Sequence, residues 1–265
     1  MSEENSPFEI VLPDGTIYRP NKTEMKNEHT VKGYDAEGKP KKMKFAAKNE
    51  CKRCGECCRR DTPLILKDDL SLLTEGIISE KDIYTIREGE KVRSSIDGEI
   101  YYTPMELIKI KPIFGSFTCL FYDPAEGCTI YEKKPLVCRK FECWSPNVEI
   151  TGIEKRSLTR ADLFKGVELI EKAIRKHDEK CSPTVFNDLI QELRSGKEEN
   201  VEKIAEMILF DFQIRDWAKE KLSISEEVLP LLFGKTLFEM ASIYGLIIEK
   251  DGDNFIIKVT QEEIE

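Results

Sequence analysis

The stretch Cys51-Lys52-Arg53-Cys54-Gly55-Glu56-Cys57-Cys58 places four cysteines within eight residues. Cys51, Cys54 and Cys57 are each separated from the next by two residues, a spacing that lets a tight loop wrap its thiolates around one metal cluster, as in bacterial ferredoxins. Gly55 suits such a loop because glycine readily adopts a positive φ. The stretch therefore predicts a fold that is organised around a metal centre.

A second group of cysteines follows downstream, at Cys119, Cys128, Cys138 and Cys143. With the first stretch it offers eight thiolates, the number that two four-sulfur sites require. Zinc sites made of four thiolates usually draw on two C-x2-C knuckles, and the second group contains none. The spacing therefore favours iron–sulfur centres, with two 4Fe-4S centres as the expected arrangement and zinc as the alternative.

Cys57 and Cys58 are direct neighbours. In an extended backbone, the side chains of neighbouring residues point to opposite sides. We therefore expect the two sulfurs to serve different centres.

The composition limits the class of protein. The chain has 265 residues, enough to form a hydrophobic core without help from its cysteines, and its formal charge of -9 argues against a protein that coats nucleic acid. Its amino terminus does not resemble a signal peptide, and no apolar run approaches the length of a membrane span. These features predict a cytoplasmic protein with no membrane segment. Thiols stay reduced in the cytoplasm, which favours metal binding over disulfides.

Basic residues gather around the first cysteine stretch. Between Lys39 and Arg60 there are nine basic residues and two acidic ones. We expect Arg53, Arg59 and Arg139, which lie beside the predicted ligands, to offset the charge of the thiolates or to donate hydrogen bonds to sulfur. The lysines nearer residue 40 fit the solvated surface of a hairpin.

The pattern of apolar and turn residues predicts an α+β protein. Residues 7–48 contain β-hairpin material, since short apolar runs flank the turn Pro13-Asp14-Gly15, and another turn is expected at 36–38. Residues 49–145 carry the eight cysteines of the two groups. Residues 146–265 are expected to be mostly helical, with a helix that starts at Ser182-Pro183 and a terminal hairpin over 247–257. This gives three predicted parts: a hairpin segment 1–48, a cysteine-cluster domain 49–145 and a helical unit 146–265.

The cysteine pattern resembles a known family. The residues that carry the likeness are Cys51-x2-Cys54-x2-Cys57-Cys58 and Cys119-x8-Cys128-Thr129-Ile130-Tyr131-x3-Pro135-x2-Cys138-Arg139-x-Phe141-x-Cys143. This arrangement is similar to that of the YkgJ-type cysteine-cluster proteins, the CxxCxxCC family, described as a putative zinc- or iron-chelating domain. The likeness covers about residues 49–145 and all eight cysteines, with Lys134-Pro135 where members often have Arg-Pro. It implies a metal centre but supplies no reaction.

The remaining candidates for chemistry are few. His29 and His177 are the only histidines, and neither lies near a nucleophile motif, so acid–base catalysis by histidine is not expected. Glycine motifs that cradle nucleotides are absent. Cys181 follows His177 by one helical turn, but we interpret it as a free thiol because Ser182-Pro183 starts a new element there.

The sequence favours an iron–sulfur protein that takes part in electron transfer or in a redox step of a larger system, together with a redox or other protein partner. Four-coordinate sites closed by cysteine leave no open position for a substrate, so Lewis-acid catalysis is disfavoured. The contrasting hypothesis is a zinc-stabilised interaction module. A third is an iron–sulfur oxidoreductase component whose helical unit supports catalysis, for which no substrate is indicated.

Overall fold

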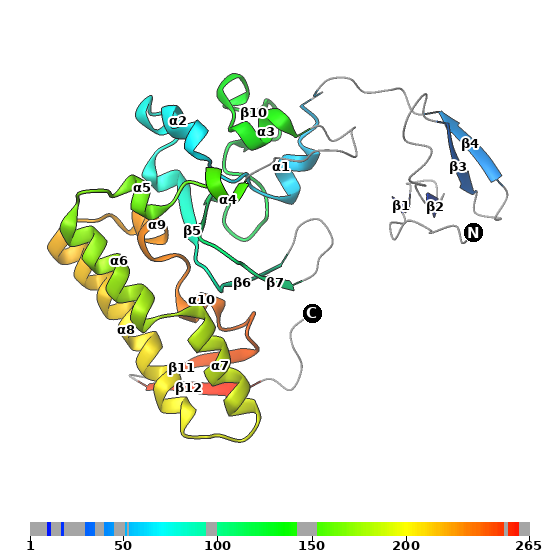
Figure 1. Ribbon diagram of the computed structural model, residues 1–265. Coiled ribbons are helices and arrows are strands. Elements are labelled where there is room, and N and C mark those ends of the chain that lie inside the picture. Colours follow the sequence, from blue (N-terminus) through cyan, green and yellow to red (C-terminus); the bar gives the residue numbers. More distant parts are fainter. Residues whose placement is uncertain are drawn as a thin grey trace. The chain divides into compact units, whose positions relative to one another are not determined.

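A computed structural model describes residues 10–11, 17–18, 30–34, 40–44, 51, 53–93, 100–141, 153–251 and 254–259 (Figure 1). The chain divides into two compact units. The first comprises Met1–Cys54 and Phe141–Glu149, and the second comprises Gly55–Lys140 and Ile150–Glu265. The domain boundaries that the sequence predicts at residues 48 and 145 stay a prediction.

The first unit contains a four-stranded antiparallel sheet in the order β1-β2-β3-β4. Its strands are β1 (Ile10–Val11), β2 (Ile17–Tyr18), β3 (Thr30–Tyr34) and β4 (Pro40–Lys44). The pairing of β1 with β2 and of β3 with β4 confirms both hairpins expected in this segment. The residues of the two connecting turns lie outside the described residues.

The second unit mixes helices with small antiparallel strand pairs, which confirms the α+β class. Its helices are α1 (Glu56–Arg60), α2 (Leu70–Thr74), α3 (Leu136–Lys140), α4 (Ile153–Arg156), α5 (Arg160–Leu163), α6 (Glu168–Lys180), α7 (Pro183–Arg194), α8 (Asn200–Leu222), α9 (Leu229–Phe233) and α10 (Leu237–Met240), with 3-10 turns η2 (Lys67–Asp69), η3 (Glu80–Asp82), η4 (Tyr131–Lys133) and η5 (Glu226–Val228). The strand pairs are β5 (Ile83–Ile86) with β8 (Leu107–Ile110), β6 (Lys91–Arg93) with β7 (Ile100–Tyr102), β9 (Tyr122–Asp123) with β10 (Gly127–Cys128), and β11 (Leu246–Asp251) with β12 (Asn254–Val259). The last pair is the expected terminal hairpin.

The longest helix, α8, packs against both α6 and α7 (Figure 1). Ser182 caps α7 by accepting a hydrogen bond from the Val185 amide, and Pro183 occupies the first turn, as the sequence predicts. None of the helices in the described part of the chain combines the length and the apolar composition that a membrane crossing requires.

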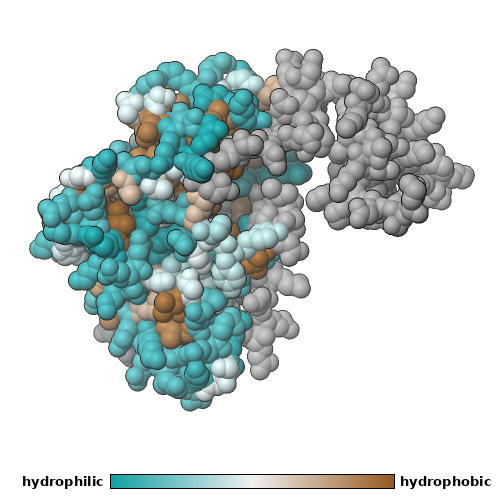
Figure 2. Space-filling model, viewed as in Figure 1, coloured by the Kyte–Doolittle hydropathy of each residue, from teal (hydrophilic) through white to brown (hydrophobic). Residues whose placement is uncertain are grey.

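Two groups of buried side chains form the core of the second unit. One joins residues before Cys119, such as Ile65 and Ile110, to residues of the helical part, such as Ile214 and Phe233. The other lies between α7, α8 and the carboxy-terminal elements. On the face seen in Figure 2, apolar residues reach the surface in small separate areas. The cysteine-bearing segment and the helices therefore share one of the two cores.

A buried ion-pair network joins α6, α8 and α10. Asp211 lies 2.9 Å from His177 Nε2 and accepts hydrogen bonds from Arg215 Nε at 2.7 Å and from the Leu237 amide at 2.8 Å. Burial by itself would raise the pKa of the Asp211 carboxyl, but the hydrogen bond with His177 and the charge of Arg215 hold this pKa at about 2. The ionised carboxylate therefore stabilises the packing of the three helices.

We expect Asp211→Asn to lower the free energy of unfolding by about 2 kcal/mol near pH 7, because the folded-state pKa lies below that of an unfolded aspartate. The stabilisation from an acid with a lowered pKa is present above pH ~4 and is lost as the pH falls toward 2. The stability difference between wild type and variant, measured by urea denaturation, should therefore narrow over that range. Asp216→Asn, on an exposed position of the same helix, is the control and should show no such narrowing. A difference that stays constant with pH would contradict the role of Asp211.

Candidate metal centre

Five of the eight predicted ligands lie in the second unit. They are Cys57, Cys58, Cys119, Cys128 and Cys138. Cys51 and Cys54 belong to the first unit, and Cys143 lies outside the described residues. The geometry of the centre is therefore described for the five thiols of the second unit.

Cys57 and Cys58 both lie in the short helix α1. Their sulfurs are only 3.9 Å apart. The expectation that the two side chains diverge is wrong, because it assumed an extended backbone, whereas a helical turn brings these neighbouring sulfurs together. Which metal each sulfur binds stays a prediction.

Gly55 positions the start of α1. Its φ is +76°, the left-handed conformation that glycine adopts without strain, as the sequence predicts for this loop. The ring of Tyr122 lies directly against its α-carbon, so a side chain would have no room there. Arg59 holds that ring in place by donating a hydrogen bond of 2.8 Å to the Tyr122 hydroxyl. The absence of a side chain at residue 55 thus lets α1 approach β9.

Backbone hydrogen bonds join the two cysteine groups. The Cys119 amide donates to the Cys58 carbonyl at 2.7 Å, so the second group begins beside the end of the first. In the β9–β10 pair, Cys128 lies opposite Tyr122. The turn of this hairpin is fixed by Asp123, whose carboxylate accepts hydrogen bonds from the amides of the residues two and three positions ahead. The hairpin thereby returns Cys128 toward Cys119.

Cys138 is placed by helix α3, and α3 begins on a buried carboxylate. Asp69 accepts a hydrogen bond of 2.7 Å from the Leu136 amide and one of 3.1 Å from the Leu66 amide, and Arg139 lies 3.5 Å away. A negative charge at the start of a helix satisfies amides that lack a partner in the helix and complements its dipole. The sequence analysis missed Asp69, because nothing in the local sequence connects it with a helix so far along the chain.

The thiols of the second unit affect one another electrostatically. The hydrogen bond between the two neighbouring thiols lowers the pKa of Cys57 to about 6 and raises that of Cys58. Burial, helped by the charges of Cys128 and Cys57, raises the pKa of Cys119 to about 11. Burial also raises the pKa of Cys138 to about 12, with further contributions from the charges of Cys119 and Cys128. Ionisation of Cys58, Cys119 and Cys138 near neutral pH is therefore unfavourable, and a bound cation would favour the thiolate form that metal ligands take.

The arginines flank this cluster but form hydrogen bonds with oxygen. Arg59 pairs with Glu56 at 2.9 Å in addition to its bond with Tyr122, and Arg139 faces Asp69. Arg53 belongs to the first unit. A direct role of these arginines toward sulfur stays a prediction.

These features define a cysteine-rich metal-binding protein, in which thiols from α1, the loop before β9, β10 and α3 lie near enough to influence one another's pKa. Residues 50–182 match the CxxCxxCC family, described as "Putative zinc- or iron-chelating domain". The chain belongs to this family, and its domain chelates zinc or iron. This confirms the resemblance, and the match extends past residue 145 to Ser182, the residue that caps α7. Neither the curated proteins nor the solved structures contain a match to the chain.

Cys181 lies apart from the other thiols, in the second core group. Its sulfur and the side-chain donor atoms of His177 and Asp211 all lie within 4.8 Å of one another, so these three residues form a possible set of metal ligands. The carboxylate, however, already pairs with His177 and with Arg215, and the Cys181 thiol donates to the Met207 carbonyl at 3.6 Å. An added cation would have to displace the positive charge of Arg215. The group is better explained as a core ion-pair network.

We expect Cys181→Ser to leave the metal content of the purified protein unchanged, since the Cys181 thiol and the Asp211 carboxylate already have partners. Cys119→Ser is the matched control, because it also replaces a buried thiol but should reduce the metal content. Elemental analysis of both variants makes the comparison. Loss of one equivalent of metal from Cys181→Ser would instead identify Cys181 as a ligand.

We expect Gly55→Ala to reduce metal content, because the added methyl group meets the Tyr122 ring and the backbone conformation is strained for alanine. Gly76→Ala is the control. Gly76 also has a positive φ, of +69°, but nothing lies within 4 Å of the position its methyl group would take. The control should lose a little stability and retain its metal. Equal metal content in the two variants would show that the contact of Tyr122 with residue 55 does not position the ligands.

Proposed function

We propose that the cysteine cluster binds iron–sulfur centres, two of the 4Fe-4S type, and serves electron transfer or a redox step of a larger system. The observation that carries the proposal is the number of thiols that act on one another. Five interacting cysteines lie in the second unit, whereas one tetrahedral zinc ion takes four ligands. A centre with several metal ions, or a pair of neighbouring centres, would bind the fifth thiol as well.

The proposed ligands are the eight cysteines of the two groups: Cys51, Cys54, Cys57, Cys58, Cys119, Cys128, Cys138 and Cys143. We assign Arg53, Arg59 and Arg139 to the surroundings of the centre, where their charges would partly offset those of the thiolates. When bound, an iron–sulfur centre supplies one-electron redox chemistry. The protein's own contribution is to hold the thiolates, to limit the access of water and to place positive charge nearby.

Electron transfer is favoured over substrate chemistry for two reasons. Sites closed by four cysteines offer a substrate no free coordination position. Cys57 is also exposed, so the cluster lies close enough to the surface for a partner to approach. The loop that leads to Cys119 carries exposed aromatic side chains, Phe114 and Phe117, of the kind enriched at protein interfaces. We propose a redox protein as the partner.

A zinc-stabilised interaction module is the second candidate, and the spacing of the adjacent pair favours it. Two thiolates bound to one tetrahedral zinc ion, with zinc–sulfur distances of ~2.3 Å, lie about 3.8 Å apart. The sulfurs of Cys57 and Cys58 are separated by 3.9 Å. In this reading the metal is structural, and the surface around it recruits a partner.

Anaerobic purification, followed by measurement of iron, acid-labile sulfide and zinc on one sample, separates the two candidates. We expect iron and sulfide in similar amounts, together with visible charge-transfer absorption that is lost on oxidation or in Cys119→Ser. The control Cys181→Ser should keep both the iron and the absorption. Zinc without sulfide in the anaerobic sample would reject the iron–sulfur proposal in favour of the structural module.

A further inference from the structure

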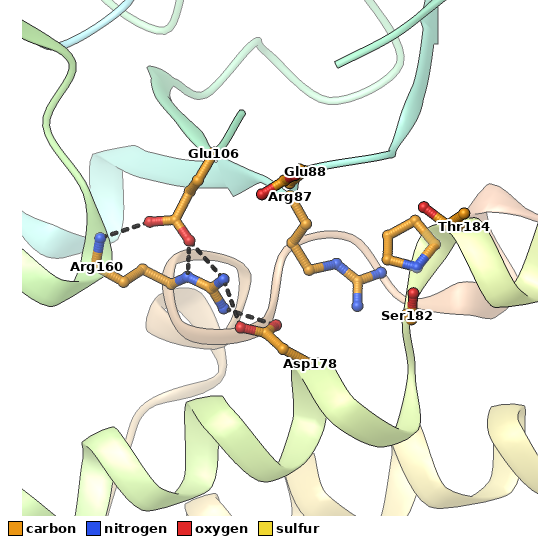
Figure 3. A pocket seen from close by; sticks show the side chains of 8 residues that line it. Arg87, Glu88, Glu106, Arg160, Asp178, Ser182 and Thr184 are labelled. Carbon is orange, nitrogen blue, oxygen red and sulfur yellow. Dashed lines mark hydrogen bonds and ion pairs between the residues drawn. The ribbon is translucent and has the colours of Figure 1, made fainter. Parts of the chain in front are cut away.

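A polar pocket in the second unit has no role in the metal centre. Its volume is about 330 Å³, within the range typical of small-molecule sites. Figure 3 shows the side chains that line it. It is lined by Arg87, Glu88, Glu106, Arg160, Asp178, Ser182, Pro183 and Thr184. None of these residues is a proposed metal ligand.

On one wall of the pocket, the side chains already form hydrogen bonds and ion pairs within the protein. Arg160 is buried and donates to Glu106 and to Asp178 (Figure 3). It also donates to the Leu232 carbonyl. Its Nη1 also donates to Asp178, so all five N–H groups of the guanidinium have acceptors. Glu106 accepts from the Arg160 amide as well, at 2.6 Å. These three side chains form a fixed wall with little capacity left for a ligand.

Arg87 is the charged lining residue whose guanidinium has hydrogen-bond donors without a good acceptor. Its side chain is only 3% exposed. Nη1 donates to the Cys181 carbonyl at 2.8 Å, Nη2 makes only a weak contact with Met240 sulfur at 3.9 Å, and Nε has no hydrogen-bond acceptor. Glu90 is equally buried, and its carboxylate forms an ion pair with Arg87 at 3.8 Å from Nε. A buried guanidinium that uses so few of its five donors retains capacity for an anion that enters the pocket.

The start of α7 faces the same space. Ser182 and Thr184 line the pocket, and the Ser182 hydroxyl, which caps the helix, can still donate its own hydrogen. Gly89 has a positive φ, and its α-carbon lies directly against the Thr184 hydroxyl, so the turn that carries Arg87 comes close to the helix. The positive end of the 12-residue helix and the arginine thus act on one region of the pocket.

We propose that this pocket binds a small monocarboxylate, whose acid group is held by Arg87, Ser182 and Thr184. A flat carboxylate with one negative charge matches the planar fork of a guanidinium. Phosphate is disfavoured, because the lining contains three acidic residues and only two arginines, and a doubly charged anion would be repelled more strongly. Glu88, which is exposed at the edge, is the acid without an internal partner in Figure 3.

Titration of the ¹⁵N-labelled full chain with butyrate, butylamine and inorganic phosphate, at matched ionic strength, tests the proposal. We expect butyrate alone to shift the amide signals of Thr184 and Val185 in a saturable manner. Glu88→Gln should strengthen butyrate binding by roughly threefold, because it removes a repulsive charge at the edge. Glu220→Gln makes the same change of charge on an exposed position of α8 outside the pocket, and it should leave the affinity unchanged.

Arg87→Lys keeps the charge but removes the planar fork, and it should weaken butyrate binding by about tenfold or more. Because Arg87 is buried, the binding result for Arg87→Lys is used only if the spectrum of this variant is that of a folded protein. The result for Glu88→Gln tests the proposal whether or not Arg87→Lys folds. The proposal is overturned if butyrate produces no saturable shift, if phosphate binds as tightly as butyrate, or if Glu88→Gln leaves butyrate binding unchanged.

Discussion

The cost of ionising buried, closely placed thiols is the constraint on which the rest of this structure depends. Five cysteines of the second unit influence one another's ionisation, and burial, with a smaller contribution from their mutual repulsion, makes full deprotonation unfavourable. A bound cation removes that penalty, so metal binding and the local structure stabilise each other. Before a metal binds, the surrounding contacts hold the thiols near one another. These contacts include the backbone hydrogen bond between Cys119 and Cys58 and the buried helix cap at Asp69.

The features that were predictable from the sequence are local ones. The positive φ of Gly55, the cap at Ser182, the amino-terminal hairpins and the terminal hairpin all follow from a few neighbouring residues, and all were expected. The spacing of the cysteines indicated a metal-binding domain in the same way, because ligands close in sequence are constrained by the short chain between them. The family match agrees with that prediction.

The features that were missed depend on contacts between distant segments. The helical turn that brings the sulfurs of Cys57 and Cys58 together was not anticipated, because α1 is too short to show a helical period. The Asp69 carboxylate acts on a helix that begins 67 residues later. The pocket at the start of α7 combines residues of a turn, of three helices and of the loop before β8, and no sequence pattern relates them. A contact between one polar side chain and a distant segment produces no periodic pattern in the sequence.

The core shared by the cysteine-bearing segment and the helices limits how this domain can be moved between proteins. Cys119 and Cys58 pack in the same group of apolar side chains as Ala173 of α6, Ala218 of α8 and Phe233 of α9. A fragment that ended after Cys143, the last cysteine of the second group, would expose this apolar surface to water. The metal-binding segment is therefore not a portable module, and a recombination event or an engineered fusion would have to carry its helical scaffold with it.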